Sequence, residues 1–145
     1  MATAERRANV VWRGNLFEGS GSLDLASSEA AQGLPVTWAS RTERPDGKTS
    51  PEELIAAAHA SCYAMALSNT LADGGNDPEE LGISAVCTFD VDQLKVTTMV
   101  LDVHGRVPGL DADGFQQAAA QAEQVCPVSN ALRGNVDIQV NASLD

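Results

Sequence analysis

Residues 50–71 read SPEELIAAAHASCYAMALSNTL, and this stretch decides the fold because it predicts one long helix with defined ends. Ser50 is a favoured N-cap residue, Pro51 suits the first helical position, and Glu53 completes a Ser-x-x-Glu capping box. Ala, Leu and Met, which are strong helix formers, fill the body of the stretch. Gly74-Gly75 follows as a stop signal.

The composition of this predicted helix is typical of a buried element. No residue between Leu54 and Leu67 carries a formal charge, and six of these residues are Ala. A helix that is apolar nearly all round is buried. Two reactive side chains lie within it, His59 and Cys62, three residues apart and therefore on one face. His59 is either a general base for a Cys62 nucleophile or a packed helix histidine.

Two carboxylates at the start of the helix differ in their direction relative to Cys62. At about 100° per residue, Glu52 lies about 80° around the helix from Cys62, whereas Glu53 lies on the opposite side. We therefore expect Glu52 to serve the chemistry and Glu53 to serve the cap. Ten residues at about 1.5 Å rise separate Glu52 from Cys62 by roughly 15 Å along the axis. Glu52 must then act through its long side chain or in the site of a second subunit.

The chain as a whole has 145 residues, which suits one compact domain with a real core. Its net charge of −11 and the lack of a long basic run argue against nucleic acid or an anionic membrane as a partner. No apolar run has transmembrane length, and the start MATAERRANVVW lacks the apolar region of a secretory signal. Three cysteines without tight spacing do not indicate a secreted disulfide-rich domain, so we expect a cytoplasmic protein.

Strand patterns surround the central helix. We expect strands at residues 9–17, 22–26, 34–39, 82–92, 93–106 and 135–142. A polar loop over residues 40–50 carries Arg41, Arg44 and Lys48. A second helix is expected over residues 114–125, capped by Asp111 or Asp113 and ended or kinked by Cys126-Pro127. The order of strands, helix, strands, helix and strand predicts an α+β fold with antiparallel sheets packed against helices.

Each of the three cysteines has a structural interpretation as well as a chemical one. A free cysteine commonly packs as a small apolar residue, and we expect this of Cys87, which alternates with apolar neighbours on a predicted strand. A thiolate at Cys62 would need a nearby cation, which Arg41 or Arg44 can supply. If the two predicted helices pack side by side, Cys62 and Cys126 can form a redox pair.

The sequence contains no familiar motif for a metal or cofactor. Its cysteines and histidines lack the C-x-x-C and H-x-x-x-H spacings of zinc sites. Neither G-x-x-x-x-G-K-S/T nor G-x-G-x-x-G occurs. We therefore expect neither a metal nor a bound cofactor.

Two motifs together carry a resemblance to a known family. The run SPEELIAAAHASCYAMALS (residues 50–68) and the tetrad CPVS (residues 126–129) resemble the OsmC/Ohr family of thiol-dependent peroxidases. The resemblance covers nearly the whole chain, as one OsmC-like domain over residues 1–145, and His59 and Val128 are more typical of the OsmC branch. It implies an α+β fold in which antiparallel sheets wrap around long central helices in an intertwined homodimer, with sites at the subunit interface.

The resemblance also implies a role for each matching residue. Cys62 corresponds to the peroxidatic cysteine, which a peroxide converts to a sulfenic acid, and Cys126 to the resolving cysteine, which closes a disulfide with it. Glu52 corresponds to a glutamate that orients an arginine. Arg41 is our choice for that arginine, because the family reads roughly T-R-F-E-G before the helix, although the Phe is absent here. Arg44 is the alternative.

The function that these implied roles predict is reduction of organic hydroperoxides, with no metal or cofactor and with recycling by a dithiol such as a lipoylated protein. Two other functions are compatible with the residues. One is a non-enzymatic redox-sensing or ligand-binding dimer that uses the cysteine pair as a switch. The other is a Cys/His acyl-transfer or hydrolase site, which would depend on His59 but not on Cys126.

Overall fold

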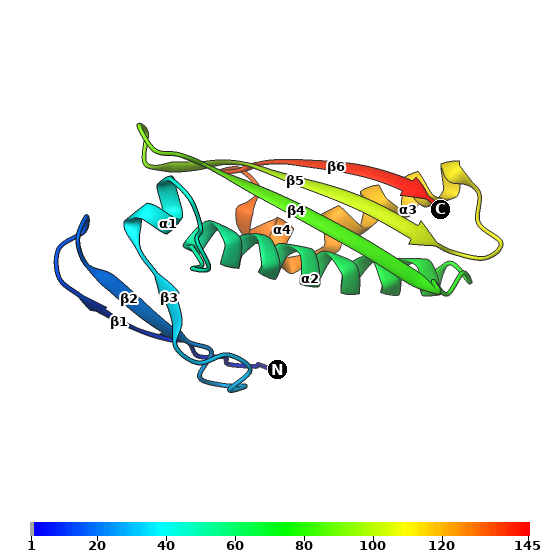
Figure 1. Cartoon of the computed structure of the whole chain (residues 1–145). Helices are drawn as coiled ribbons and strands as arrows, with labels where there is room; N and C mark the ends of the chain where they lie inside the picture. The colour runs from blue at the N-terminus through cyan, green and yellow to red at the C-terminus, as the bar shows by residue number, and fades with distance from the viewer. Residues whose placement is uncertain (1) are drawn as a thin grey trace. The chain divides into compact units, whose positions relative to one another are not determined.

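The computed structural model describes residues 2–145, which divide into two compact units (Figure 1). The N-terminal unit extends to Pro51, and the C-terminal unit is Glu52–Asp145. The elements follow the order β1-β2-β3-α1-α2-β4-β5-α3-α4-β6, so the chain belongs to the α+β class that the sequence predicts. The expectation of a single domain over the whole chain stays a prediction.

The N-terminal unit contains a three-stranded antiparallel sheet in the order β1-β2-β3. Its strands are β1 (Asn9–Arg13), β2 (Ser20–Asp24) and β3 (Leu34–Val36). Strand β1 ends earlier than predicted because Gly14 follows it at a φ of +92°, a conformation that glycine adopts without strain. Pro35 lies in β3 at the sheet edge, as predicted, where a residue without an N–H donor is tolerated.

A short helix in the N-terminal unit was not predicted. Helix α1 (Trp38–Thr42) occupies residues that the sequence assigns to the end of a strand and the start of a loop. Its N-cap is Thr37, whose hydroxyl accepts a hydrogen bond from the Ser40 N–H at 3.0 Å. The Ser40 hydroxyl is paired in turn with the Thr37 N–H at 3.0 Å. A five-residue helix is too short to show helical periodicity, and a serine completes its capping box in place of the usual Glu or Gln.

The C-terminal unit contains the second sheet, in the order β4-β5-β6. Strands β4 (Glu80–Asp90) and β5 (Lys95–Arg106) pair antiparallel, as predicted, with Ala85 opposite Leu101. Strand β6 (Asp137–Leu144) pairs with β5 in parallel, which departs from the predicted antiparallel arrangement. The reason is the connection: α3 (Ala112–Val125) and α4 (Pro127–Leu132) carry the chain from the end of β5 back to its start. Parallel neighbours require such a crossover.

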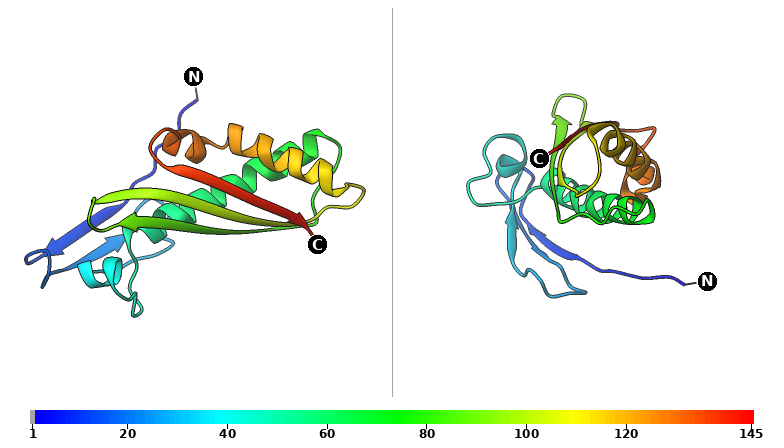
Figure 2. Two further views of the ribbon diagram at one scale, coloured as in Figure 1. Left: turned by 90° about the horizontal axis from the view of Figure 1, so that it is seen from above. Right: turned by 90° about the vertical axis from the view of Figure 1, so that its right-hand side faces the viewer.

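The helices of the C-terminal unit cover one face of this sheet, as both views show (Figures 1 and 2). Helix α2 (Pro51–Asp73) and α3 lie along the strands and enclose the hydrophobic core. The core side chains from β5 alternate along the strand, as expected for a sheet with one covered face. The largest fully buried apolar side chains are Tyr63 and Leu67 of α2, Met99, Leu101 and Val103 of β5, and Phe115 of α3.

Helix α2 is covered along one face within this chain. The buried residues His59, Tyr63, Leu67 and Leu71 recur at every fourth position. The composition of α2 predicts a helix that is buried nearly all round. Met65 lies on the other side of α2 and is 72% exposed, so this chain alone does not bury that side. Within residues 2–145, no helix has both the length and the apolar character needed to cross a membrane.

Candidate active site

Cys62 and Cys126 lie next to each other in the C-terminal unit. Cys62 is in the middle of α2, and Cys126 lies between α3 and α4. The Cys126 thiol donates a hydrogen bond to the Cys62 sulfur, with 3.3 Å between the two Sγ atoms. Both thiols are free. Cys126 is fully buried, whereas Cys62 is partly exposed. A disulfide needs a sulfur separation of about 2 Å, so a small movement would join them.

Local sequence fixes the position of Cys126. Asp111 is the N-cap of α3 and accepts a hydrogen bond from the Gly114 N–H at 2.8 Å. Cys126 is both the C-cap of α3 and the N-cap of α4, with extended backbone angles. Pro127 requires this, because proline disfavours a helical conformation in the residue before it. The helix end predicted at Cys126-Pro127 is confirmed, whereas α4, with six residues, was not predicted.

His59 makes a buried contact that the sequence did not predict. Its Nε2 lies 2.6 Å from the Ser129 hydroxyl oxygen, and both residues are fully buried. This hydrogen bond joins α2 to α4. His59 is therefore packed and bonded, as the packed-histidine interpretation requires, and its Nε2 is directed at Ser129. Within residues 2–145, its other ring nitrogen, Nδ1, has no hydrogen-bond partner.

The signal for Ser129 was present in the sequence but is weak. Serine follows three residues after Cys126, at the position whose side chain returns to the N-cap in a capping box. The spacing alone does not reveal that the hydroxyl meets an imidazole 70 residues away in the chain.

The two thiols have different affinities for protons. Burial raises the pKa of the Cys62 thiol, the neighbouring Cys126 raises it further, and the Val128 N–H only partly offsets these effects. Burial also acts to raise the pKa of Cys126, but the net direction there is downward. The Ser129 hydroxyl, the N–H groups of Ser129 and Val128, and the Cys62 thiol together outweigh burial. Cys126 therefore forms its thiolate more readily than Cys62 does in these surroundings.

Glu52 and Cys87 lie elsewhere in the C-terminal unit. Glu52 is 6% exposed in the first turn of α2. Burial raises the pKa of the Cys87 thiol, and the negative charge of Glu52 raises it further. Cys87 also packs against the core, as predicted. This position against the core agrees with the packing role that strand alternation predicts for Cys87.

The two candidate arginines lie in the N-terminal unit and differ in exposure. Arg41 belongs to α1 and is half-buried, with its guanidinium carbon 5.7 Å from the centre of the Trp38 ring. Trp38 in turn meets Phe17 edge to face at 6.2 Å. Arg44 lies in the exposed turn that follows α1 and lines a small hollow beside Pro45.

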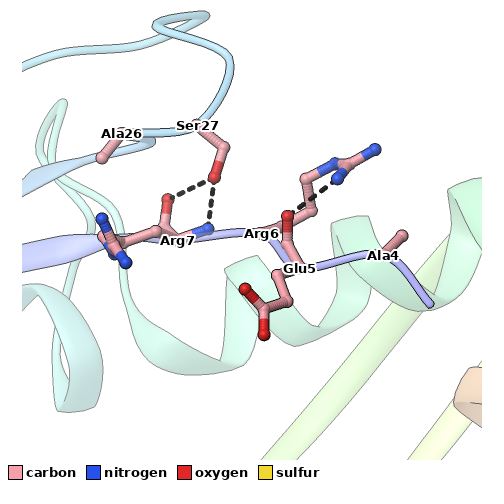
Figure 3. A pocket seen from close by; sticks show the side chains of 6 residues that line it. All are labelled: Ala4, Glu5, Arg6, Arg7, Ala26 and Ser27. Atoms are coloured by element: carbon pink, nitrogen blue, oxygen red, sulfur yellow. Dashed lines mark hydrogen bonds between the residues drawn. The ribbon is translucent and has the colours of Figure 1, made fainter.

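A separate surface hollow lies between the residues that precede β1 and those that follow β2 (Figure 3). It is lined by Ala4, Glu5, Arg6, Arg7, Ala26 and Ser27, and the Ser27 hydroxyl is hydrogen-bonded to the Arg7 backbone. Its lining contains no thiol and no imidazole. Within residues 2–145, no group of three or more His, Cys, Asp or Glu side chains is arranged to hold a metal ion.

Comparisons with known proteins agree with this fold. The family model for OsmC-like protein matches residues 44–141. Peroxiredoxin OsmC from Escherichia coli K12 is 34% identical over 138 residues, which are 94% of this chain and 95% of that protein. An organic hydroperoxide resistance protein from Xanthomonas axonopodis pv. citri is 36% identical over 92 residues, 62% of this chain and 63% of its own.

Solved structures share the fold over the full length of the chain. The crystal structure of an organic hydroperoxide resistance protein OsmC from Legionella pneumophila superposes with a TM-score of 0.72 at 24% identity, covering 99% of both chains. The matched residues 44–141 include α2, both cysteines of the close pair and most of the sheet in the C-terminal unit. With these elements in the same arrangement, the chain belongs to the OsmC-like protein family.

Proposed function

We propose that this protein is a thiol-dependent peroxidase that reduces organic hydroperoxides to alcohols. The observation that carries the proposal is the 3.3 Å contact between Cys62 and Cys126. Relatives named peroxiredoxin OsmC and organic hydroperoxide resistance protein support a peroxide-related function. Their names indicate the substrate class, and oxidation of the cysteine pair to a disulfide can provide the two electrons that reduce the peroxide.

The proposed reaction has three steps. The Cys62 thiolate attacks one peroxide oxygen, the O–O bond breaks, and the leaving alkoxide takes up the proton that Cys62 released, so the products are a Cys62 sulfenic acid and the alcohol. The Cys126 thiolate then attacks the Cys62 sulfur, the S–O bond breaks, and the products are a disulfide and water. A dithiol, such as a lipoylated protein, reduces this disulfide by thiol–disulfide exchange. The cycle requires neither a metal nor a bound cofactor.

The first step requires a positive charge near Cys62, because burial raises the pKa of that thiol. We propose Arg41 for this role, oriented by Glu52, in the same subunit or in a partner. The half-buried position of Arg41 against Trp38 favours it over the exposed Arg44. A guanidinium both favours the thiolate and donates hydrogen bonds to peroxide oxygens. The burial of Glu52 supports its proposed role of orienting Arg41, because a buried carboxylate needs charged or hydrogen-bonding partners.

We also propose that the protein is a homodimer. Small and apolar residues form an exposed stripe along α2, at Ala58, Ser61 and Met65. An exposed apolar helix face is typical of an interface, and the small residues would allow close approach of a second copy. A cytoplasmic location remains part of the proposal, supported by the odd number of cysteines without a disulfide framework.

The proposed function is tested by measuring cumene hydroperoxide consumption in the presence of dithiothreitol. We expect the wild type and Cys87→Ser to turn over continuously, because Cys87 lies in the core as a structural cysteine. Cys62→Ser should be inactive. Without dithiothreitol, which can itself reduce a sulfenic acid, Cys126→Ser should react with one equivalent of peroxide and form no intramolecular disulfide on a non-reducing gel.

A different result for the wild type would contradict the enzyme. If the reduced protein is oxidised once and dithiothreitol does not support further consumption, the cysteine pair acts as a switch. The redox-sensing dimer would then replace the peroxidase. A Cys87→Ser variant as inactive as Cys62→Ser would overturn the assignment of the reacting thiols.

A further inference from the structure

The buried contact between His59 and Ser129 has no part in the reaction proposed above. Its Nε2 to Oγ distance of 2.6 Å is short for a hydrogen bond, and neither side chain is accessible to water. Ser129 belongs to the first turn of α4, and Cys126 is the N-cap of the same helix. The hydroxyl of Ser129 therefore has the imidazole of α2 as one partner and Cys126 as a near neighbour.

When Cys126 is ionised, the hydrogen-bonding capacities of Cys126, Ser129 and His59 determine which group donates and which accepts in each hydrogen bond. A thiolate can only accept, and a serine hydroxyl has one hydrogen to donate. If that hydrogen goes to the Cys126 sulfur, Ser129 Oγ must accept from His59, whose Nε2 then carries the proton. In this tautomer Nδ1 carries no proton. The lack of a partner for Nδ1 within residues 2–145 fits a bare acceptor, because a buried N–H without an acceptor is rarer in proteins.

The surrounding charges are compatible with a neutral imidazole. Burial lowers the pKa of His59, and the Glu123 carboxylate of α3 acts against it. That carboxylate is itself paired with Arg133 at 2.5 Å. Burial has the largest single effect on the pKa of Cys126 and raises it. Among the groups that lower this pKa, the Ser129 hydroxyl has the largest effect, larger than that of either backbone N–H group. Tyr63 on the next turn of α2 donates to the Ala119 carbonyl at 2.8 Å and is engaged elsewhere.

We propose that His59 and Ser129 are positioning residues for Cys126: His59 Nε2–H holds the Ser129 hydroxyl, and that hydroxyl stabilises the Cys126 thiolate for its attack on oxidised Cys62. This role deepens the proposed function and rests on it. In the step concerned, the Cys126–Cys62 bond forms and the Cys62 S–O bond breaks. The leaving hydroxide takes up the proton that Cys126 released, so one water is the only other product.

The first test measures the thiolate directly and needs no turnover. In a Cys62→Ser, Cys87→Ser background, the ultraviolet absorbance of the remaining thiolate is followed against pH. Ser129→Ala should raise the apparent pKa of Cys126 by about one unit, since a hydrogen bond to a charged group has about that strength. Ser129→Thr, which keeps the hydroxyl, should restore most of the shift. His59→Leu should shift the pKa in the same direction as Ser129→Ala, whereas the exposed-site control Ser84→Ala should not.

The second test separates the two chemical steps in a single turnover of otherwise native protein. Peroxide loss reports sulfenic acid formation, and a non-reducing gel of alkylated samples reports disulfide formation. Ser129→Ala should lower the ratio of the disulfide rate to the peroxide rate about ten-fold. The Cys62 sulfenic acid should accumulate and become more open to overoxidation. A purely structural role would slow both steps together or lower the melting temperature without changing this ratio.

The outcomes distinguish the two proposals. An unchanged pKa of Cys126 in both Ser129→Ala and His59→Leu would overturn the positioning role, whether or not the protein is a peroxidase. If the pKa shifts but the wild type does not turn over with dithiothreitol, the positioning role stands and the peroxidase is wrong. Circular dichroism of each variant confirms that it is folded before either result is interpreted.

Discussion

The two thiols of the candidate site differ in their surroundings although only 3.3 Å separates them. Cys62 lies in the body of α2, where the helix dipole has little effect. Cys126 lies at the start of α4, where N–H groups and the Ser129 hydroxyl favour its thiolate. The pair is thus arranged so that the proposed resolving thiol ionises readily, whereas the proposed peroxidatic thiol depends on a cation for its reactivity.

That dependence makes a prediction for the arginines. Arg41→Ala should lower kcat/KM for cumene hydroperoxide about a hundred-fold, as expected when a charge-stabilising donor is removed. Arg41→Lys should recover only part of the loss, because an ammonium lacks the planar fork of the guanidinium. Arg44→Ala is the matched control and should stay close to the wild type. Initial rates with dithiothreitol decide the matter, and a larger loss in Arg44→Ala would transfer the role to Arg44.

The residues of the site were predictable to different degrees. Cys62 and Cys126 follow from motifs whose residues are local in the sequence, and Cys87 follows from strand alternation. The bond between His59 and Ser129 depends on how α2 packs against α4, and no local pattern encodes it. Helix geometry favours Glu52 over Glu53 for the chemistry; Glu52 is buried and Glu53 is exposed, and the role of Glu52 stays a prediction.

Among the secondary-structure elements, the long ones were predictable and the short ones were not. Helix α2 and strands β4 and β5 carry many turns or alternations, so their patterns are clear. Helices α1 and α4 have five and six residues, and each depends on a cap more than on periodicity. The parallel pairing of β6 was missed because alternation predicts which face of a strand is buried, and the direction of pairing depends on the crossover through α3 and α4.

The cap of α3 gives a prediction for element stability. The sequence left Asp111 and Asp113 as alternatives, and the structure assigns the cap to Asp111 through its 2.8 Å bond with Gly114. Asp111→Ala should lower the free energy of unfolding by about 1 kcal/mol. This corresponds to a fall in melting temperature of about 3 °C for a chain of this size. Asp113→Ala, which leaves the cap intact, should cost only a few tenths of a kcal/mol. If Asp111→Ala and Asp113→Ala lower the melting temperature equally, the hydrogen bond between Asp111 and Gly114 does not contribute measurably to stability.

For the whole molecule, the apolar composition of α2 exceeds what one chain covers. Met65 remains 72% exposed on a helix whose other face forms the core. A second copy that packs its own α2 against this stripe would bury both faces. Met65→Glu would then place two like charges at a closely packed interface, where an unpaired charge is costly. We therefore expect Met65→Glu to dissociate the proposed homodimer, and Leu94→Glu, on an equally exposed apolar residue of the β4–β5 turn, to leave it intact.

Size-exclusion chromatography with light scattering measures this difference directly. The wild type and Leu94→Glu should have twice the 15.1 kDa mass of the chain, and Met65→Glu should have the mass of one chain. A wild type that is monomeric at micromolar concentration would reject the dimer. If Met65→Glu is monomeric and loses peroxide turnover while its Cys62–Cys126 disulfide still forms with a chemical oxidant, the site requires both subunits. If monomeric Met65→Glu keeps full turnover, one chain supplies every group that the reaction needs.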